Sequence, residues 1–138
     1  MLLVGCSSSP DYGPADDTTA ISADVAGGFA GPNVDNHSGV HVVGTTATYI
    51  DGTTTSEATV ALADVETMIH ALETVDFLDL PATAPPCASD TPVLTIEVTL
   101  AAGANHIDRD VACGGRITAL DQQIADLSGF SAWRTAHQ

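Results

Sequence analysis

The sequence predicts an α+β fold in which an antiparallel sheet of four to five strands carries two helices on one face, in the order ββα-ββα. Several segments alternate apolar and polar residues with a period of two, which is typical of strands that bury one face. Two other segments space their apolar residues by three, four and three positions, which places them on one side of a helix. A half-buried sheet and two one-sided helices can bury each other's apolar surfaces in a single layered domain.

The first half of the chain supplies two strand regions and the first helix. Residues 21–29 alternate, and residues 40–50 form a second region that Gly44 divides into two short strands. Asp51-Gly52 is a tight-turn signal that closes this region. The helix follows, with an apolar stripe made of Leu62, Val65, Ile69 and Leu72.

The second half repeats the order of strands and helix. Leu94, Ile96, Val98 and Leu100 alternate with polar residues, and a turn at 101–105 leads to a partner strand at 106–111. We therefore expect a hairpin. The second helix places one stripe toward the core, and Trp133 is expected to cover the open end of that core; the stripe consists of Ile117, Leu120, Ile124 and Leu127.

The charge of the chain excludes some classes of partner. The sequence has 18 acidic residues, three arginines and no lysine, for a formal net charge of −15. Binding to nucleic acid depends on basic residues that displace counterions from phosphates, so we expect no nucleic-acid partner. Attraction to anionic lipid headgroups also needs a basic face, so we expect any membrane attachment to be covalent.

The N-terminus carries the clearest signal of location. Leu3-Val4-Gly5-Cys6 resembles a bacterial lipobox, and only Met1 to Val4 precede Gly5-Cys6 in place of a full signal peptide. The resemblance implies that residues 1–5 are a signal-peptide remnant and that Cys6 is the lipid attachment site. Residues 6–19 are then a flexible linker, and residues 20–138 form one globular domain. Ser7 after the cysteine is typical of outer-membrane sorting in a Gram-negative host.

The cysteine count also indicates an exported protein. Setting Cys6 aside leaves Cys87 and Cys113, an even pair that we expect to form a disulfide in an exported protein. The alternative, an intracellular domain without lipid, predicts a free Cys6 and a reduced pair.

The histidines offer two weaker candidate sites. His37 and His41 are four residues apart, but strand character would separate their Cα atoms by about 13 Å, so we expect no metal site there. His106, Asp108 and Asp110 alternate and should share one face of a strand, which is most simply the solvated face of the sheet. No nucleophile, phosphate-loop or dinucleotide motif occurs in the sequence.

These observations predict a bacterial lipoprotein of the cell envelope, held to the outer or cytoplasmic membrane with its domain in the periplasm or outside the cell. We expect its domain to be a non-enzymatic binding or structural module with no catalytic residues, no metal and no cofactor. The alternative is a hydrolase or metal-binding enzyme that uses the face formed by His106, Asp108 and Asp110.

Overall fold

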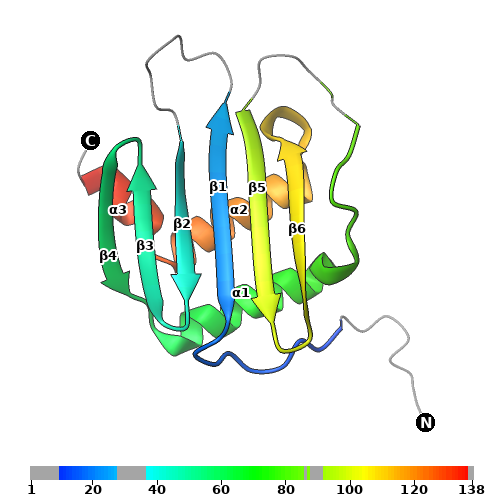
Figure 1. Cartoon of the computed structure of the whole chain (residues 1–138), viewed down its shortest axis with the longest axis horizontal. Helices are drawn as coiled ribbons and strands as arrows, with labels where there is room; N and C mark the ends of the chain where they lie inside the picture. Colours follow the sequence, from blue (N-terminus) through cyan, green and yellow to red (C-terminus); the bar gives the residue numbers. More distant parts are fainter. Residues whose placement is uncertain (1–9, 28–36, 86, 88–91, 137–138) are drawn as a thin grey trace.

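The computed structural model describes residues 10–27, 37–85, 87 and 92–136. Within them the chain forms one six-stranded antiparallel sheet in the order β4-β3-β2-β1-β5-β6, with three α-helices behind it (Figure 1). The predicted α+β class is therefore confirmed, whereas the predicted numbers of strands and helices were too low. The strands are β1 (Ala20–Gly27), β2 (Ser38–Val43), β3 (Thr46–Asp51), β4 (Thr54–Thr59), β5 (Pro92–Leu100) and β6 (Gly103–Asp110). The helices are α1 (Leu62–Thr74), α2 (Arg116–Leu127) and α3 (Phe130–Ala136), with short 3-10 turns η1 (Phe77–Asp79) and η2 (Val111–Cys113).

Strand β1 is at the centre of the sheet and joins its two halves. It pairs with β2 on one side and with β5 on the other, both antiparallel. The predicted division of the 40–50 region is correct, because β2 and β3 are separated by a turn at Gly44 and Thr45. The predicted hairpin is also present as β5 and β6.

The two elements that the sequence prediction missed are β4 and α3. Strand β4 is an edge strand of sequence TTSEAT whose residues are exposed or half-buried, so it has no apolar alternation to reveal it. Helix α3 has only seven residues, which is shorter than the window of about 11–18 residues in which a helical periodicity can be recognised. The predicted order ββα-ββα thus becomes ββββα-ββαα.

The core lies between one face of the sheet and the helices. Ile21, Val42 and Ile96 from three neighbouring strands are fully buried in it. The apolar stripe of α2 is largely as predicted, since only Leu127 remains half-buried. In α1 the prediction was wrong for Leu62, which is 51% exposed because it is the first residue of the helix, and Met68 is buried instead.

The end of the core near β3 is closed by aromatic side chains. Trp133 stacks on Tyr49 with ring centroids 5.3 Å apart, and Phe130 lies 5.9 Å from Trp133. The Tyr49 hydroxyl donates a hydrogen bond of 2.6 Å to the carbonyl of Ser128 at the end of α2. The expected role of Trp133 is therefore confirmed, and it depends on the short α3.

Residues 10–19, which precede β1, are part of the domain, which corrects the prediction of a flexible linker for this part of residues 6–19; residues 6–9 lie outside the described residues. The described part, from Pro10 onward, runs across the end of the sheet (Figure 1). Tyr12 is only 5% exposed and belongs to the core. Its backbone N–H donates to Glu73 at 2.7 Å, and its hydroxyl oxygen accepts from the N–H of Leu78 at 3.1 Å. An aromatic ring in a polar stretch gave no periodic signal, so its burial was not evident from the sequence.

The predicted disulfide is present. Cys87 and Cys113, which are 26 residues apart in sequence, form a disulfide with their Cα atoms 6.3 Å apart. It ties the loop before β5 to the turn η2 after β6. The bridge closes a loop of 26 residues, which lowers the entropy of the unfolded chain and stabilises the folded state by about 3.5 kcal/mol. This is a large share of the stability of a small domain.

The burial of Tyr12 makes a prediction about stability. Replacing Tyr12 with Ala removes a buried ring and should lower the free energy of unfolding by about 3–5 kcal/mol. Tyr12→Phe removes only the acceptor for Leu78 and should lower it by about 1–2 kcal/mol. Urea denaturation followed by circular dichroism measures both values. If residues 10–19 were a free linker, both variants would unfold at the parent's denaturant concentration.

Candidate functional site

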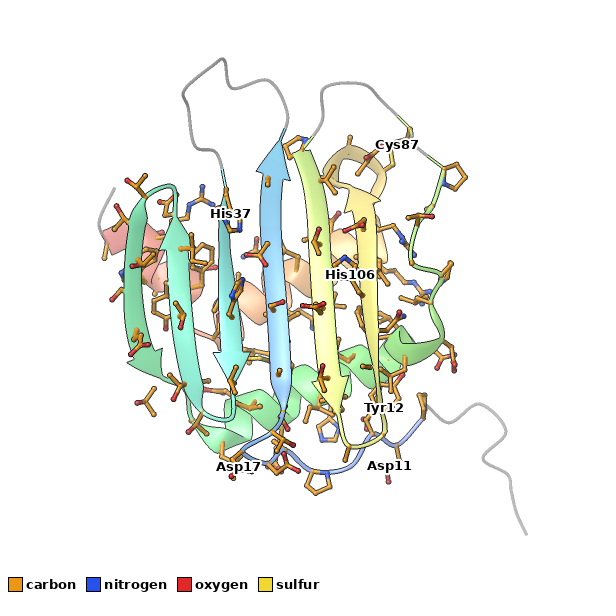
Figure 2. All side chains as sticks on the ribbon, in the orientation of Figure 1. Asp11, Tyr12, Asp17, His37, Cys87 and His106 are labelled. Carbon is orange, nitrogen blue, oxygen red and sulfur yellow. A yellow bond between two sulfur atoms is a disulfide. The ribbon has the colours of Figure 1, made fainter. Side chains whose placement is uncertain are left out.

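The face of the sheet opposite the helices carries the candidate site. Figure 2 shows this face toward the viewer, with the helices behind the sheet. Side chains of β2, β1, β5 and β6 that point away from the core lie on it, because successive residues of a strand alternate between faces. We call this surface the open face; its polar members are Ser22, Asp24, His41, Thr95, Glu97, His106 and Asp108 of the strands, together with His37, which directly precedes β2.

Strand register arranges these residues in two rows across the sheet. Ser22 of β1 is opposite His41 on one side and Glu97 on the other, and Glu97 is opposite His106. The next row places Asp24 between Gly39 and Thr95, with Asp108 beyond Thr95. A shallow groove of about 380 Å³ runs along the open face over β2, β1 and β5 and reaches His106 of β6.

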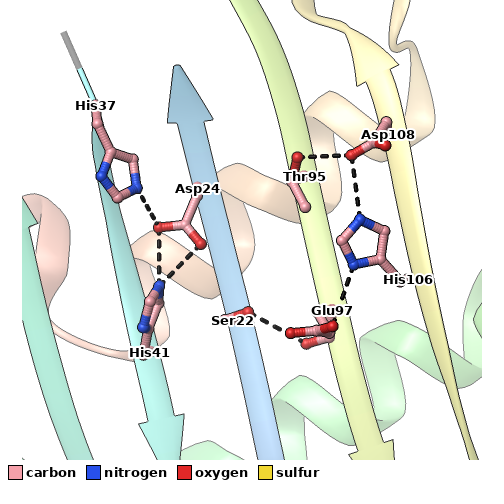
Figure 3. Close-up of polar contacts among 8 residues, drawn as sticks. All are labelled: Ser22, Asp24, His37, His41, Thr95, Glu97, His106 and Asp108. Carbon is pink, nitrogen blue, oxygen red and sulfur yellow. Dashed lines mark hydrogen bonds and ion pairs between the residues drawn. The ribbon is translucent and has the colours of Figure 1, made fainter.

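The first cluster of the open face is built around His106 (Figure 3). Its Nδ1 lies 3.1 Å from Glu97 Oε2 and its Nε2 lies 3.4 Å from Asp108 Oδ1. The Thr95 hydroxyl donates to the same Asp108 oxygen at 2.7 Å. The hydrogen bond to Glu97 raises the pKa of His106 above its ordinary value, with the charges of Asp108 and Glu97 adding to the effect and desolvation opposing it.

The predicted row of His106, Asp108 and Asp110 is only partly assembled. His106 and Asp108 meet as expected, but Asp110 accepts a hydrogen bond of 3.1 Å from the backbone N–H of Cys87. Asp110 is the last residue of β6, where the chain turns toward the disulfide. Its carboxylate therefore belongs to the cysteine loop rather than to the cluster around His106.

The contact between His106 and Glu97 predicts how the pKa of His106 responds to a substitution of Glu97. Glu97→Gln keeps the shape of the partner but removes its charge, so the pKa of His106 should fall toward the ordinary histidine value. NMR titration of the imidazole signals measures this shift. His70, which lies on α1 against Glu73 and makes no contact with Glu97, serves as the internal control, and its NMR signals should not differ between the parent and the variant. A constant His106 pKa in the variant would show that Glu97 does not act on it.

The second cluster joins two histidines that the sequence analysis had kept apart. His37 Nε2 lies 2.9 Å from Asp24 Oδ1, and His41 Nε2 lies 3.0 Å from the same oxygen and 2.9 Å from Oδ2 (Figure 3). The expected spacing of about 13 Å was the distance between the Cα atoms of the two histidines. A carboxylate on the neighbouring strand can contact both side chains at that spacing. Because His37 and His41 lean toward each other, one carboxylate contacts both rings.

Gly39 makes this contact possible. It lies between the two histidines on the open face of β2, opposite Asp24 in register. A side chain at this position would overlap Asp24 Oδ1 and the backbone oxygen of Ala23. The carboxylate of Asp24 therefore occupies the space that any other residue at position 39 would fill.

Another acidic residue, Asp121, lies on the helix side of the sheet, behind this cluster. Asp121 of α2 lines a small cavity of about 110 Å³ together with Gly39 and Arg134. Burial raises the pKa of Asp121 to about 6, and the charge of Asp24 adds to the shift. Nothing in the sequence pattern distinguished Asp121, because an acidic residue beside a helical apolar stripe usually lies in solvent.

The raised pKa of Asp121 predicts a pH dependence of stability. The folded state holds this proton up to about pH 6, whereas an unfolded aspartic acid loses it near its ordinary value of 3.8. The group's contribution to stability is therefore fully present below pH 3.8 and is lost as the pH rises to about 6.

Replacing Asp121 with Asn should abolish that loss. With allowance for partial exposure, we expect the variant to be more stable than the parent by about 1–2 kcal/mol at pH 7 and equal to it near pH 4. Urea denaturation across this pH range provides the measurement. If the free energies of unfolding of the parent and the variant differed by the same amount at pH 4 and at pH 7, the raised pKa of Asp121 would be contradicted.

A group of possible metal ligands also occurs at the disulfide. Atoms of Cys87, Asp110 and Cys113 lie within 4.8 Å of one another. The two sulfur atoms are bonded to each other, and a disulfide does not supply the thiolates that bind metal ions. The group is therefore structural as long as the bridge is intact.

The predicted lipid attachment site, Cys6, lies outside the described residues. Among those that are described, no helix combines the length and apolar character needed to cross a membrane. The sequence matches no protein-family model and no curated protein.

Proposed function

We propose that this chain is a bacterial lipoprotein of the cell envelope, held to the membrane through lipid on Cys6, whose domain is a non-enzymatic binding module. The open face of the sheet is its binding surface. The observation that carries the proposal is the pairing of Cys87 with Cys113, which leaves Cys6 as the remaining cysteine of the chain. A disulfide is expected in exported proteins, and the remaining cysteine stands in the lipobox-like sequence.

The geometry of the open face supports binding rather than hydrolysis. In the hydrolase alternative, His106 would act as the base. Glu97 and Asp108 both contact its ring and favour the protonated form, which is a poor proton acceptor. Among the described residues, the contacts of His106 and His41 are with carboxylates, and no hydroxyl or thiol is hydrogen-bonded to either ring.

The position of residues 10–19 determines how the domain would sit on the membrane. The described part of the domain begins at Pro10, so only the chain from Cys6 to Pro10 separates the lipid from the domain. Four residues span at most about 14 Å when extended. The end of the sheet crossed by residues 10–19 would therefore face the membrane, and the disulfide of Cys87 at the opposite end would face away from it (Figure 2).

The lipid attachment can be tested in the native host. Mass spectrometry of the purified protein should show a chain that begins at Cys6 and carries an added diacylglycerol and an N-linked acyl chain. The Cys6→Ser variant should move from the membrane fraction to the soluble fraction, because several acyl chains at about 0.8 kcal/mol per buried methylene supply the attachment.

A matched control is available in the same chain. Cys87→Ser combined with Cys113→Ser removes the disulfide and should leave the protein in the membrane fraction. An unmodified Cys6 in the native protein, or equal membrane retention of the Cys6→Ser variant, would overturn the proposal.

A further inference from the structure

We propose that the cavity between the sheet and helices α2 and α3 binds a small zwitterionic α-amino acid, of the size of glycine or alanine. Asp121 would bind the ammonium group of this ligand, and Arg134 would bind its carboxylate. The inference goes beyond the proposed function, because the cavity lies on the helix side of the sheet and requires neither the open face nor the lipid. It depends on two charged groups without suitable partners, on the volume of the cavity, and on the residues that hold the two groups in place.

The cavity is bounded by four elements of the fold. Strands β1 and β2 form one wall, and helices α2 and α3 form the other. Small-molecule sites usually combine an apolar lining with a few polar groups at fixed positions. Here Asp121 and Arg134 supply the charged groups. The apolar side chains of the lining are those of Ala23, Val25, Val40, Ala125 and Phe130.

Two groups of opposite charge in this lining lack suitable partners. Among the described residues, the half-buried carboxylate of Asp121 forms no hydrogen bond and no ion pair. The Nε atom of Arg134 is buried without a hydrogen-bond partner, since Asp51 Oδ2 lies 3.6 Å from it. Asp121 and Arg134 therefore line the same cavity without pairing with each other. A polar group that the protein leaves unsatisfied away from solvent is expected to have a water or a ligand as its partner.

The two charges together select the ligand. A simple cation bound to Asp121 would share the cavity with the positive charge of Arg134, and a simple anion bound to Arg134 would share it with the negative charge of Asp121. A small molecule that carries both charges close together satisfies both groups at once. An α-amino acid is such a molecule, and hydrogen bonds that involve charged groups are roughly twice as strong as neutral ones.

The volume of the cavity limits the size of this ligand. A cavity of about 110 Å³ has room for about three to four water molecules, each of which occupies about 30 Å³ in the liquid. Glycine and alanine are of this size, whereas the side chain of leucine would overlap the lining. A ligand with so few atoms reaches micromolar affinity at best, so we expect a dissociation constant between the micromolar and the millimolar range.

Both charged residues lie on helices that are held in place by core contacts. Asp121 follows Leu120, which is 1% exposed and fixes α2 against the sheet. Arg134 lies on α3 with its Cζ 6.0 Å from the ring centroid of Phe130, and the Phe130 ring is itself packed 5.9 Å from Trp133. The two charged groups are therefore positioned before a ligand enters, which lowers the entropic cost of binding.

The test is an NMR titration of the full chain with glycine, L-alanine, L-leucine, acetate and methylammonium. The protein carries Cys6→Ser with its disulfide intact, and a dilute phosphate buffer at about pH 7.5 keeps Asp121, whose pKa is about 6, ionised. Glycine and alanine should shift the signals of Ala125 and Phe130, which line the cavity, and leave those of Val93, which lies outside it, in place. Acetate and methylammonium carry one charge each and should bind at least about tenfold more weakly than glycine. Leucine should cause no shift.

Variants of the two charged residues identify the groups that bind the ligand. Asp121→Asn and Arg134→Gln should each weaken glycine binding by more than about tenfold, because each removes a hydrogen bond between charged groups. Asp126→Asn and Arg116→Gln make the same changes of charge at exposed positions of α2 outside the cavity, and both should bind glycine as the parent does. Because Asp121→Asn should be more stable than the parent at pH 7, unfolding would not explain its loss of binding.

The inference is overturned if neither glycine nor alanine shifts the cavity signals of the parent, or if acetate, methylammonium or leucine binds as tightly as glycine. It is also overturned if Asp121→Asn or Arg134→Gln retains the parent's affinity, or if the two control variants lose it. None of these results bears on the proposed lipid attachment, which is measured on Cys6 in the native protein.

Discussion

One-sided burial of the sheet is the constraint on which the rest of this structure depends. Helices α1, α2 and α3 lie behind the six strands, so each strand must present apolar residues to one face and can present polar residues to the other (Figure 1). The alternation of Ile21 and Ala23 with Ser22 and Asp24 in β1 is the clearest case. Because the strands are in antiparallel register, the polar positions of separate strands meet as rows across the open face.

The composition of the chain determines what those rows contain. Without lysine and with only three arginines, the carboxylates have few cationic partners. Each of the four histidines in the described part of the chain contacts an acidic residue: His37 and His41 contact Asp24, His70 contacts Glu73, and His106 contacts Glu97 and Asp108. The imidazoles therefore serve as the main polar partners of the acidic groups on this face. This is the basis for the raised pKa of His106.

The two ends of the sheet are secured by different means. At one end, residues 10–19 cross the strands, with Tyr12 buried against Glu73 and Leu78. At the other, the disulfide between Cys87 and Cys113 holds the loop before β5 to the turn after β6. A domain of this size buries a limited apolar surface, so each constraint is a considerable part of its stability. In the proposed lipoprotein, the same N-terminal segment would hold the domain close to the membrane.

The sequence by itself determined the features that depend on local periodicity or on counting. The alternation in residues 94–100 and the stripe of Ile117, Leu120 and Ile124 predicted a hairpin and a helix, and with the other periodic segments they gave the α+β class. The even pair of cysteines predicted the bridge. These features carry their signal in neighbouring residues, because burial on one face imposes a regular spacing along the chain.

Only the tertiary structure decided where isolated side chains come together. Edge strand β4 has no buried stripe, and Tyr12 is a single aromatic residue in a polar segment, so neither had a spacing to recognise. The meeting of His37 and His41 on Asp24 requires the register of β1 against β2 and the empty position at Gly39. The raised pKa of Asp121 requires the packing of α2 on the far side of the same strands. Register and packing are relations between distant parts of the chain, and no local pattern records them.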